Sequence, residues 1–151
     1  MMDKTTDGLV NILKTTAAEN LSEVLSENES KMFTSPQPFA AYIKELLKQY
    51  GLTQSYVIEK AGFSSQYGYR LLSEERRTKQ RDYILRFCFV SGFRLEEIQR
   101  LLQLYGMSPL YARIPRDAVL ISAVSAHITE IADVNSLLQQ NGMPPLLGSN
   151  E

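Results

Sequence analysis

Apolar residues recur along this chain at the three- and four-residue spacing of an α-helix, and alternating β-branched runs are nearly absent. Side chains at that spacing share one helical face, so each run has one stripe to bury and one to expose. Glycine follows several of these runs, as at Gly51, Gly62, Gly92 and Gly106, where it favours a helix end. The pattern predicts an all-α protein.

The breaks between runs predict where individual helices begin and end. Ser35-Pro-Gln-Pro38 interrupts helix and is the best candidate for a linker. Thr53 and Ser64 are suited to cap two short helices, because their hydroxyls accept from backbone N–H groups. The expected helices span about 7–28 (as one or two pieces), 39–50, 54–61, 65–72, 79–91 and 95–105.

An internal repeat occupies the C-terminal half. Residues 81–110 align with residues 116–146, sharing Arg-Asp at the start, Leu-Leu-Gln in the middle, and Gly-Met and Pro-Leu at the end. Each copy is typical of an α-hairpin that buries its apolar face against a neighbour. We expect the aspartates to favour a first helical turn, and the arginines beside them to reach carbonyls of the neighbouring hairpin.

Residues 52–72 have the composition of a helix-turn-helix. Two short capped helices are joined through Gly62, and the second carries polar side chains in its first two turns. Gln66 and Arg70 are residue types that pair with adenine and guanine edges, and Gln54 lies at a helix N-terminus that favours phosphate. This arrangement is typical of a protein that reads DNA.

The stretch LTQSYVIEKAGFSSQYGYRLLSEERR resembles the Cro and lambda-repressor class of helix-turn-helix domains, also called the xenobiotic-response-element type. The resemblance implies a five-helix domain at about 38–106, DNA binding, commonly as a homodimer, and a role in transcription. It places Ser65, Gln66, Tyr69 and Arg70 at bases and Gln54 at phosphate. The class prefers a small residue where Ile58 stands and a branched one where Gly68 stands, so we expect these two to compensate each other sterically.

The flanking pieces resemble a bacterial, Firmicute-type subset in which such a domain precedes an Arg-Asp…Gly-x-x-Pro-Leu hairpin. The expected organisation is an acidic helical segment at 1–35, the helix-turn-helix domain at 36–110, a C-terminal α-hairpin at 111–147 and a tail at 148–151.

The distribution of charge favours a nucleic-acid partner, whereas the total charge favours a protein partner. Residues 70–86 carry six Lys or Arg against three acidic residues, so phosphate contacts are expected from Tyr67, Arg76, Arg77 and Lys79 beside the second helix. The whole chain has a net charge of −1, however, and Glu74 and Glu75 follow that helix, where they would repel phosphate. The alternative is an adaptor that keeps the fold without binding DNA. Its protein partner would bind the C-terminal hairpin or the N-terminal segment, which either packs as an extra helix or forms a dimerisation arm.

Catalytic and metal-binding chemistry has little basis in the sequence. His127 is the only histidine, and a surface or helix-end position is expected for it. The only cysteine, Cys88, lies among apolar neighbours and is expected in the core, so no internal disulfide forms. We expect neither an enzyme nor a cofactor. Without a signal peptide or a long apolar run, a soluble cytoplasmic protein with no membrane partner is expected.

Overall fold

The computed structural model describes residues 38–148 of the 151-residue chain. This part is all-helical, as predicted, and contains no strand. Its seven helices are α3 Pro38–Gln49, α4 Gln54–Ala61, α5 Ser65–Ser73, α6 Arg81–Ser91, α7 Leu95–Tyr105, α8 Pro115–Ser125 and α9 Ile131–Gln140. The acidic segment 1–35, with its expected helix at 7–28, lies outside the described residues, as does most of the 148–151 tail.

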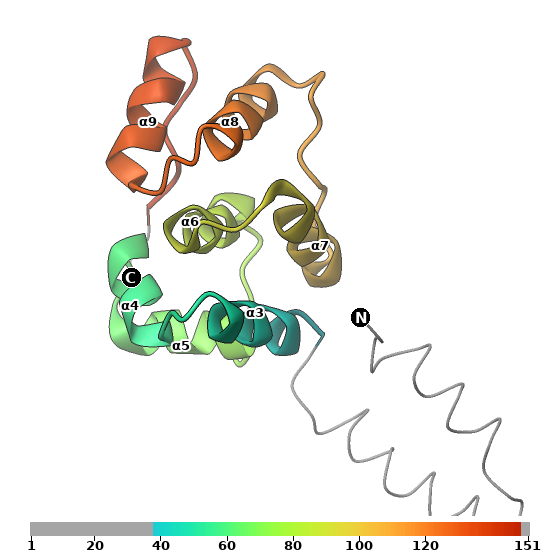
Figure 1. Cartoon of the computed structure of the whole chain (residues 1–151), viewed down its shortest axis with the longest axis vertical. Coiled ribbons are helices and arrows are strands. Elements are labelled where there is room, and N and C mark those ends of the chain that lie inside the picture. Colours follow the sequence, from blue (N-terminus) through green and yellow to red (C-terminus); the bar gives the residue numbers. More distant parts are fainter. Residues whose placement is uncertain (1–37, 149–151) are drawn as a thin grey trace, which may run out of the picture. The chain divides into compact units, whose positions relative to one another are not determined.

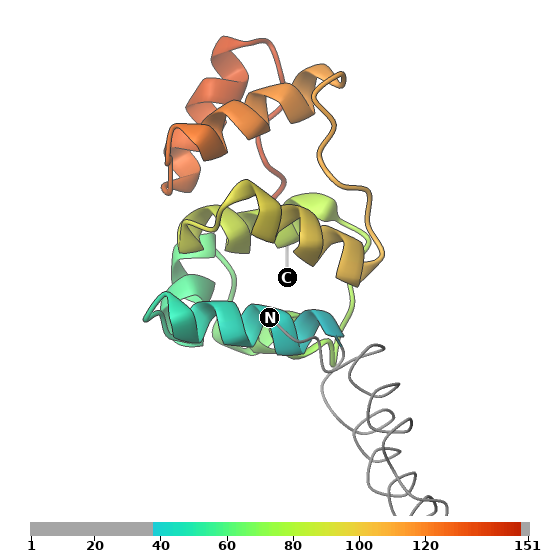
Figure 2. The same ribbon diagram turned by 45° about the vertical axis from the view of Figure 1, so that its right-hand side comes forward.

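The helices lie in three tiers (Figure 1). α3, α4 and α5 form one end, α6 and α7 lie in the middle, and α8 and α9 form the other end, an arrangement that the turned view keeps (Figure 2). α6 is the central element because it contacts α4 on one side and α9 on the other. Accordingly, eight of its eleven residues are buried. One hydrophobic core runs through the tiers, from Phe39 in α3 to Leu138 in α9.

Two aromatic pairs fix the ends of α3 within the core. The rings of Phe39 and Tyr105 meet edge to face at 4.8 Å and join α3 to the end of α7. At the other end of α3, the Tyr50 ring lies 5.1 Å from that of Phe93, and its hydroxyl donates to the buried carboxylate of Glu97. Such pairs add specific geometry to the area they bury, so α3 is fixed at both ends.

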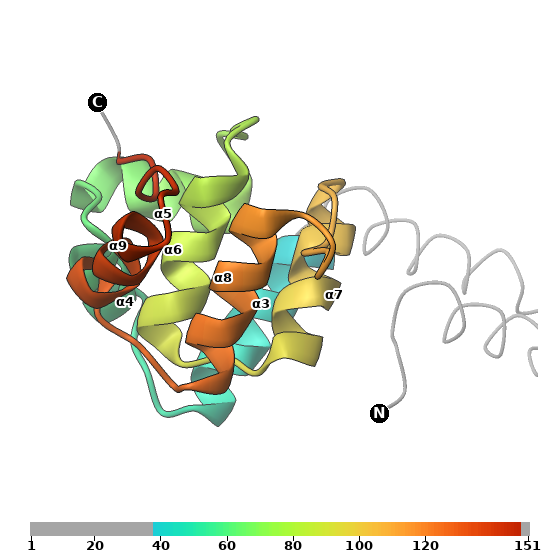
Figure 3. The ribbon, with the colours of Figure 1, turned by 90° about the horizontal axis from the view of Figure 1, so that it is seen from above.

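The repeated segments form two α-hairpins that contact each other reciprocally. α6 contacts α9 while α7 contacts α8, and in the view from above α8 lies over the space between α6 and α7 (Figure 3). Arg116 donates to both carboxylate oxygens of Asp82, at 3.0 and 2.9 Å. Arg81 makes the equivalent pair of bonds to Asp117. In each case the arginine at the start of one hairpin binds the aspartate at the start of the other.

This exchange corrects the expectation that each arginine reaches carbonyls of the neighbouring hairpin. Arg81 instead donates to the carbonyls of Ser108 and Pro109 at the end of its own hairpin, and Arg116 does the same with Pro144 and Pro145. The neighbouring hairpin supplies the aspartate. Because each guanidinium has five donors, it satisfies its own chain end and the partner carboxylate together.

Candidate nucleic-acid interface

α4 and α5 form two short capped helices with a tight turn between them. The Thr53 hydroxyl accepts from the N–H of Tyr56, and the Ser64 hydroxyl accepts from the N–H of Tyr67, as expected for N-caps. Gly62 ends α4 with φ 88°, a left-handed conformation that glycine adopts without steric cost. The turn chemistry predicted from the sequence is therefore present.

α4 and α5 cross closely at Ile58 and Gly68. A Cβ atom added to Gly68 would lie 2.3 Å from Cγ2 of Ile58, far inside van der Waals contact. Ile58 is itself only 2% exposed, so it has no room to move aside. The expected compensation between a large residue at 58 and a small one at 68 is confirmed, and it fixes the angle at which α5 is presented.

All four predicted base-contacting residues lie on α5. Ser65 and Gln66 are exposed in its first turn, and Tyr69 is 42% exposed one turn later. The Arg70 side chain is 42% exposed, and its Nε lies 3.8 Å from the carboxylate of Glu75. The structure brings these four side chains together on one helix, with hydroxyl, amide, phenol and guanidinium groups available to a ligand.

Tyr67 and Tyr69 point to opposite sides of α5. The Tyr67 ring packs against Phe63 at 5.8 Å and Tyr83 at 6.4 Å, and Arg76 lies over it at 5.6 Å. Tyr67 is thus half-buried between α5 and α6, whereas Tyr69 faces outward.

Gln54 is the first residue of α4 and is half-buried beside its capping residue. The N-terminal turn of α4 also presents Tyr56, which is 45% exposed and was absent from the predicted site. The sequence could have predicted this exposure, because Tyr56 lies outside the apolar stripe formed by Val57, Ile58 and Ala61. An exposed tyrosine beside a helix N-terminus supplies a further hydroxyl for phosphate or sugar.

Most of the basic side chains in residues 70–86 form ion pairs or hydrogen bonds within the protein. Arg81 is bound to Asp117, and Arg86 donates to the carbonyls of Ala61, Leu146 and Leu147 at 2.9, 3.1 and 2.6 Å. Arg77 binds Glu74, donates to the Tyr105 carbonyl and stacks 4.1 Å from the Tyr105 ring centroid. Arg76 and Lys79 are exposed without an ion-pair partner among the described residues, and Arg70 is partly exposed with one long contact, 3.8 Å, to Glu75.

Glu74 does not face outward from α5. It ends the helix in a left-handed conformation, φ 63°, at the position where glycine is usual. Its side chain is 2% exposed, because the carboxylate accepts from the N–H of Ala40 at 3.1 Å and pairs with Arg77. Of the two glutamates expected to repel phosphate, only Glu75 is exposed, with 68% of its side chain accessible.

The other residues considered for chemistry have structural positions. Cys88 is fully buried, and burial raises the pKa of its thiol well above the usual value. His127 is exposed just after α8 with φ 58°. Within residues 38–148, no group of three His, Cys, Asp or Glu is placed to hold a metal ion, and no helix there has the length and apolarity to cross a membrane.

Comparison of the chain with protein-family models, with curated proteins and with solved structures finds no match. The choice of the α4–α5 surface as the candidate site rests on the geometry described above.

Proposed function

We propose that this protein binds double-stranded DNA in a sequence-specific manner and regulates transcription, with α5 in the major groove. The observation that carries the proposal is the exposed row of Ser65, Gln66, Tyr69 and Arg70 on a short helix whose angle is set by the Ile58–Gly68 contact. A helix of this kind fits the major groove, where amide and guanidinium groups distinguish base pairs.

Phosphate contacts would flank α5 on both sides. Gln54 and Tyr56 at the start of α4 lie on one side, and Arg76 and Lys79 in the loop after α5 lie on the other. Phosphate contacts fix the register of the helix in the groove without reading sequence. Arg77 serves the fold in this proposal, because it bonds to Glu74 and to the Tyr105 carbonyl and stacks on the Tyr105 ring.

Selection of binding sites from a random duplex library, followed by fluorescence anisotropy titration of the selected site, tests the proposal. Gln66→Ala should relax specificity at one base pair and weaken the selected site about 5- to 150-fold, corresponding to about 1–3 kcal/mol for a bidentate contact. Lys79→Gln should instead weaken selected and scrambled duplexes alike and make binding less salt-dependent.

Gln139→Ala is the matched control, because Gln139 is an exposed glutamine on α9, at the far end of the tiers from α5. It should leave both affinities unchanged. If the folded protein shows no salt-dependent affinity for any duplex at low ionic strength, the DNA-binding proposal fails.

That negative result would favour the alternative function, an adaptor that binds a protein partner and not DNA. One observation supports this alternative. Four of the six cations in residues 70–86 have acidic or carbonyl partners within 4 Å in the protein, so the positive surface beside α5 is small. A homodimer, which the family resemblance implies, remains part of the DNA-binding proposal. In that case the selected site should contain two half-sites spaced by about one helical turn of DNA.

A further inference from the structure

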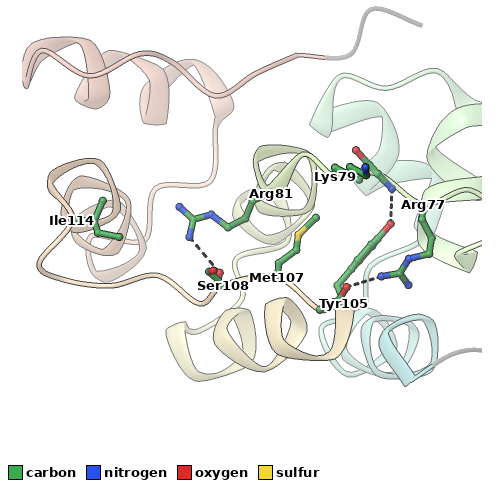
Figure 4. A pocket seen from close by; sticks show the side chains of 9 residues that line it. Arg77, Lys79, Arg81, Tyr105, Met107, Ser108 and Ile114 are labelled. Atoms are coloured by element: carbon green, nitrogen blue, oxygen red, sulfur yellow. Dashed lines mark hydrogen bonds between the residues drawn. The ribbon is translucent and has the colours of Figure 1, made fainter.

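An open pocket of about 710 Å³ lies between the α5–α6 loop, the end of α7 and the segment that leads into α8. Figure 4 shows Arg81 and Met107 in its middle, with Arg77 and Tyr105 on one side and Ile114 on the other. The pocket volume is in the range of small-molecule sites, which combine apolar walls with a few convergent polar groups. It does not coincide with the outer face of α5.

One wall of the pocket is cationic. Arg77, Lys79 and Arg81 line it, and two carboxylates, of Glu74 and Asp117, pair with the two arginines. Lys79 has no hydrogen-bond or ion-pair partner among the described residues, and it is exposed. The wall therefore has one positive charge in excess, carried by a flexible ammonium group at the pocket rim.

The pocket lining also includes two apolar side chains, Met107 and Ile114. Ile114 is 46% exposed and Met107 is half-buried, with Met107 beside the Tyr105 ring and the Arg81 side chain between Met107 and Ile114 (Figure 4). One face of the Tyr105 ring is already covered by the Arg77 guanidinium. Exposed apolar side chains that line a concavity beside an unpaired cation favour a ligand with both an apolar body and an anionic group.

We propose that this pocket binds a small organic monoanion, a carboxylate with an aliphatic or aromatic body, whose charge pairs with Lys79 while its apolar part covers Met107 and Ile114. One negative charge balances the excess charge of the wall.

A ligand in the pocket would also contact the loop that holds the end of α5 in place. The same loop carries Glu74 and Arg77, which tie the end of α5 to the N-terminus of α3 and the end of α7. An effect of the ligand on DNA affinity rests on the proposed function, whereas ligand binding itself does not. For this reason the test reads binding directly and uses no DNA.

The experiment is a ¹⁵N–¹H NMR titration of the full chain with octanoate, and separately with octanamide, its neutral counterpart. Octanoate should give saturable shifts at the amides of Thr78, Lys79, Gly106 and Met107, and octanamide should bind more weakly. Lys79→Gln should weaken octanoate roughly fivefold, as expected for a partly exposed charge pair, and leave octanamide unchanged. Ile114→Ser should weaken both probes.

Lys48→Gln is the matched control, because Lys48 is an exposed lysine in the last turn of α3. It should change neither titration. The proposal is overturned if octanoate causes no saturable shifts at these amides. It is also overturned if Lys79→Gln, with an unchanged melting temperature, leaves octanoate affinity intact, or if octanamide binds as tightly as octanoate.

Discussion

Gly68 is the single residue on which the geometry of the α4–α5 pair depends most. Glycine inside a helix costs about 1 kcal/mol relative to alanine, so its presence in α5 calls for a steric reason. The Ile58 side chain supplies that reason, since it occupies the space that a Cβ at position 68 would need. Gly68 lowers the helix propensity of α5, but it allows α4 and α5 to approach closely.

Gly68→Ala should therefore lower the free energy of unfolding by about 1–3 kcal/mol, because the clash outweighs the gain in helix propensity. In the background of Ile58→Ala the same substitution should become stabilising. Urea unfolding of the two single variants and the double variant measures both signs. A stabilising effect of Gly68→Ala in the otherwise unchanged protein would contradict the close crossing.

At the scale of the element, the end of α5 depends on Glu74 rather than on a glycine. A non-glycine residue in the left-handed conformation costs about 1–2 kcal/mol, and the carboxylate offsets this through its bonds to Ala40 and Arg77. The Ala40 N–H belongs to the first turn of α3, where a negative charge is favourable. One residue thus terminates α5 and caps α3.

Glu74→Gln should lower the free energy of unfolding by about 1–3 kcal/mol, since it keeps the shape and conformation but removes the buried charge. Hydrogen exchange should speed up first in the last turn of α5 and the first turn of α3. Glu75→Gln next to it is the control, with an expected change below about 0.5 kcal/mol, because that side chain is exposed. Equal effects of the two variants would show that the Glu74 contacts contribute little.

At the scale of the described molecule, the two hairpins are joined by a reciprocal polar network around their common core. The swapped Arg–Asp pairs lie at its centre, with the Asp117 and Asp82 side chains 1% and 9% exposed. Each aspartate also accepts a backbone N–H after a hairpin, Asp117 from Tyr111 at 3.0 Å and Asp82 from Leu147 at 2.9 Å. Removing one carboxylate leaves a largely buried arginine without its counter-charge and a backbone amide without its acceptor.

Asp117→Ala should consequently lower the free energy of unfolding by about 3–5 kcal/mol, the range for breaking a buried ion pair. Glu130→Ala removes the exposed ion pair with Lys60, whose side chains are 36% and 55% accessible, and should change stability by about 0–1 kcal/mol. Thermal unfolding of both variants gives the comparison. If both lose the same small amount, the hairpin contact does not rest on the exchanged pairs.

The candidate site was predictable to the extent that it depends on local chemistry. The caps at Thr53 and Ser64, the turn at Gly62 and the exposed polar start of α5 follow from residue types and their spacing, because a cap or a turn involves residues within four positions. The burial of Cys88 was also within reach, because its sequence neighbours are apolar, whereas the compensation between Ile58 and Gly68 was an expectation from the resemblance to the helix-turn-helix class.

Partners distant in the sequence were decided only by tertiary structure. The sequence showed two Arg-Asp repeats but not that each arginine would bind the aspartate of the other copy, 34 to 36 residues away. It also left open which of Tyr67 and Tyr69 faces inward, and it placed the Glu74 side chain at the surface, where the structure buries it against Ala40 and Arg77. By itself the sequence determined helices, caps, turns and a repeat, because those depend on neighbours along the chain. Packing decided which charges remain free for a partner, because an ion pair across a core forms only when two distant helices meet.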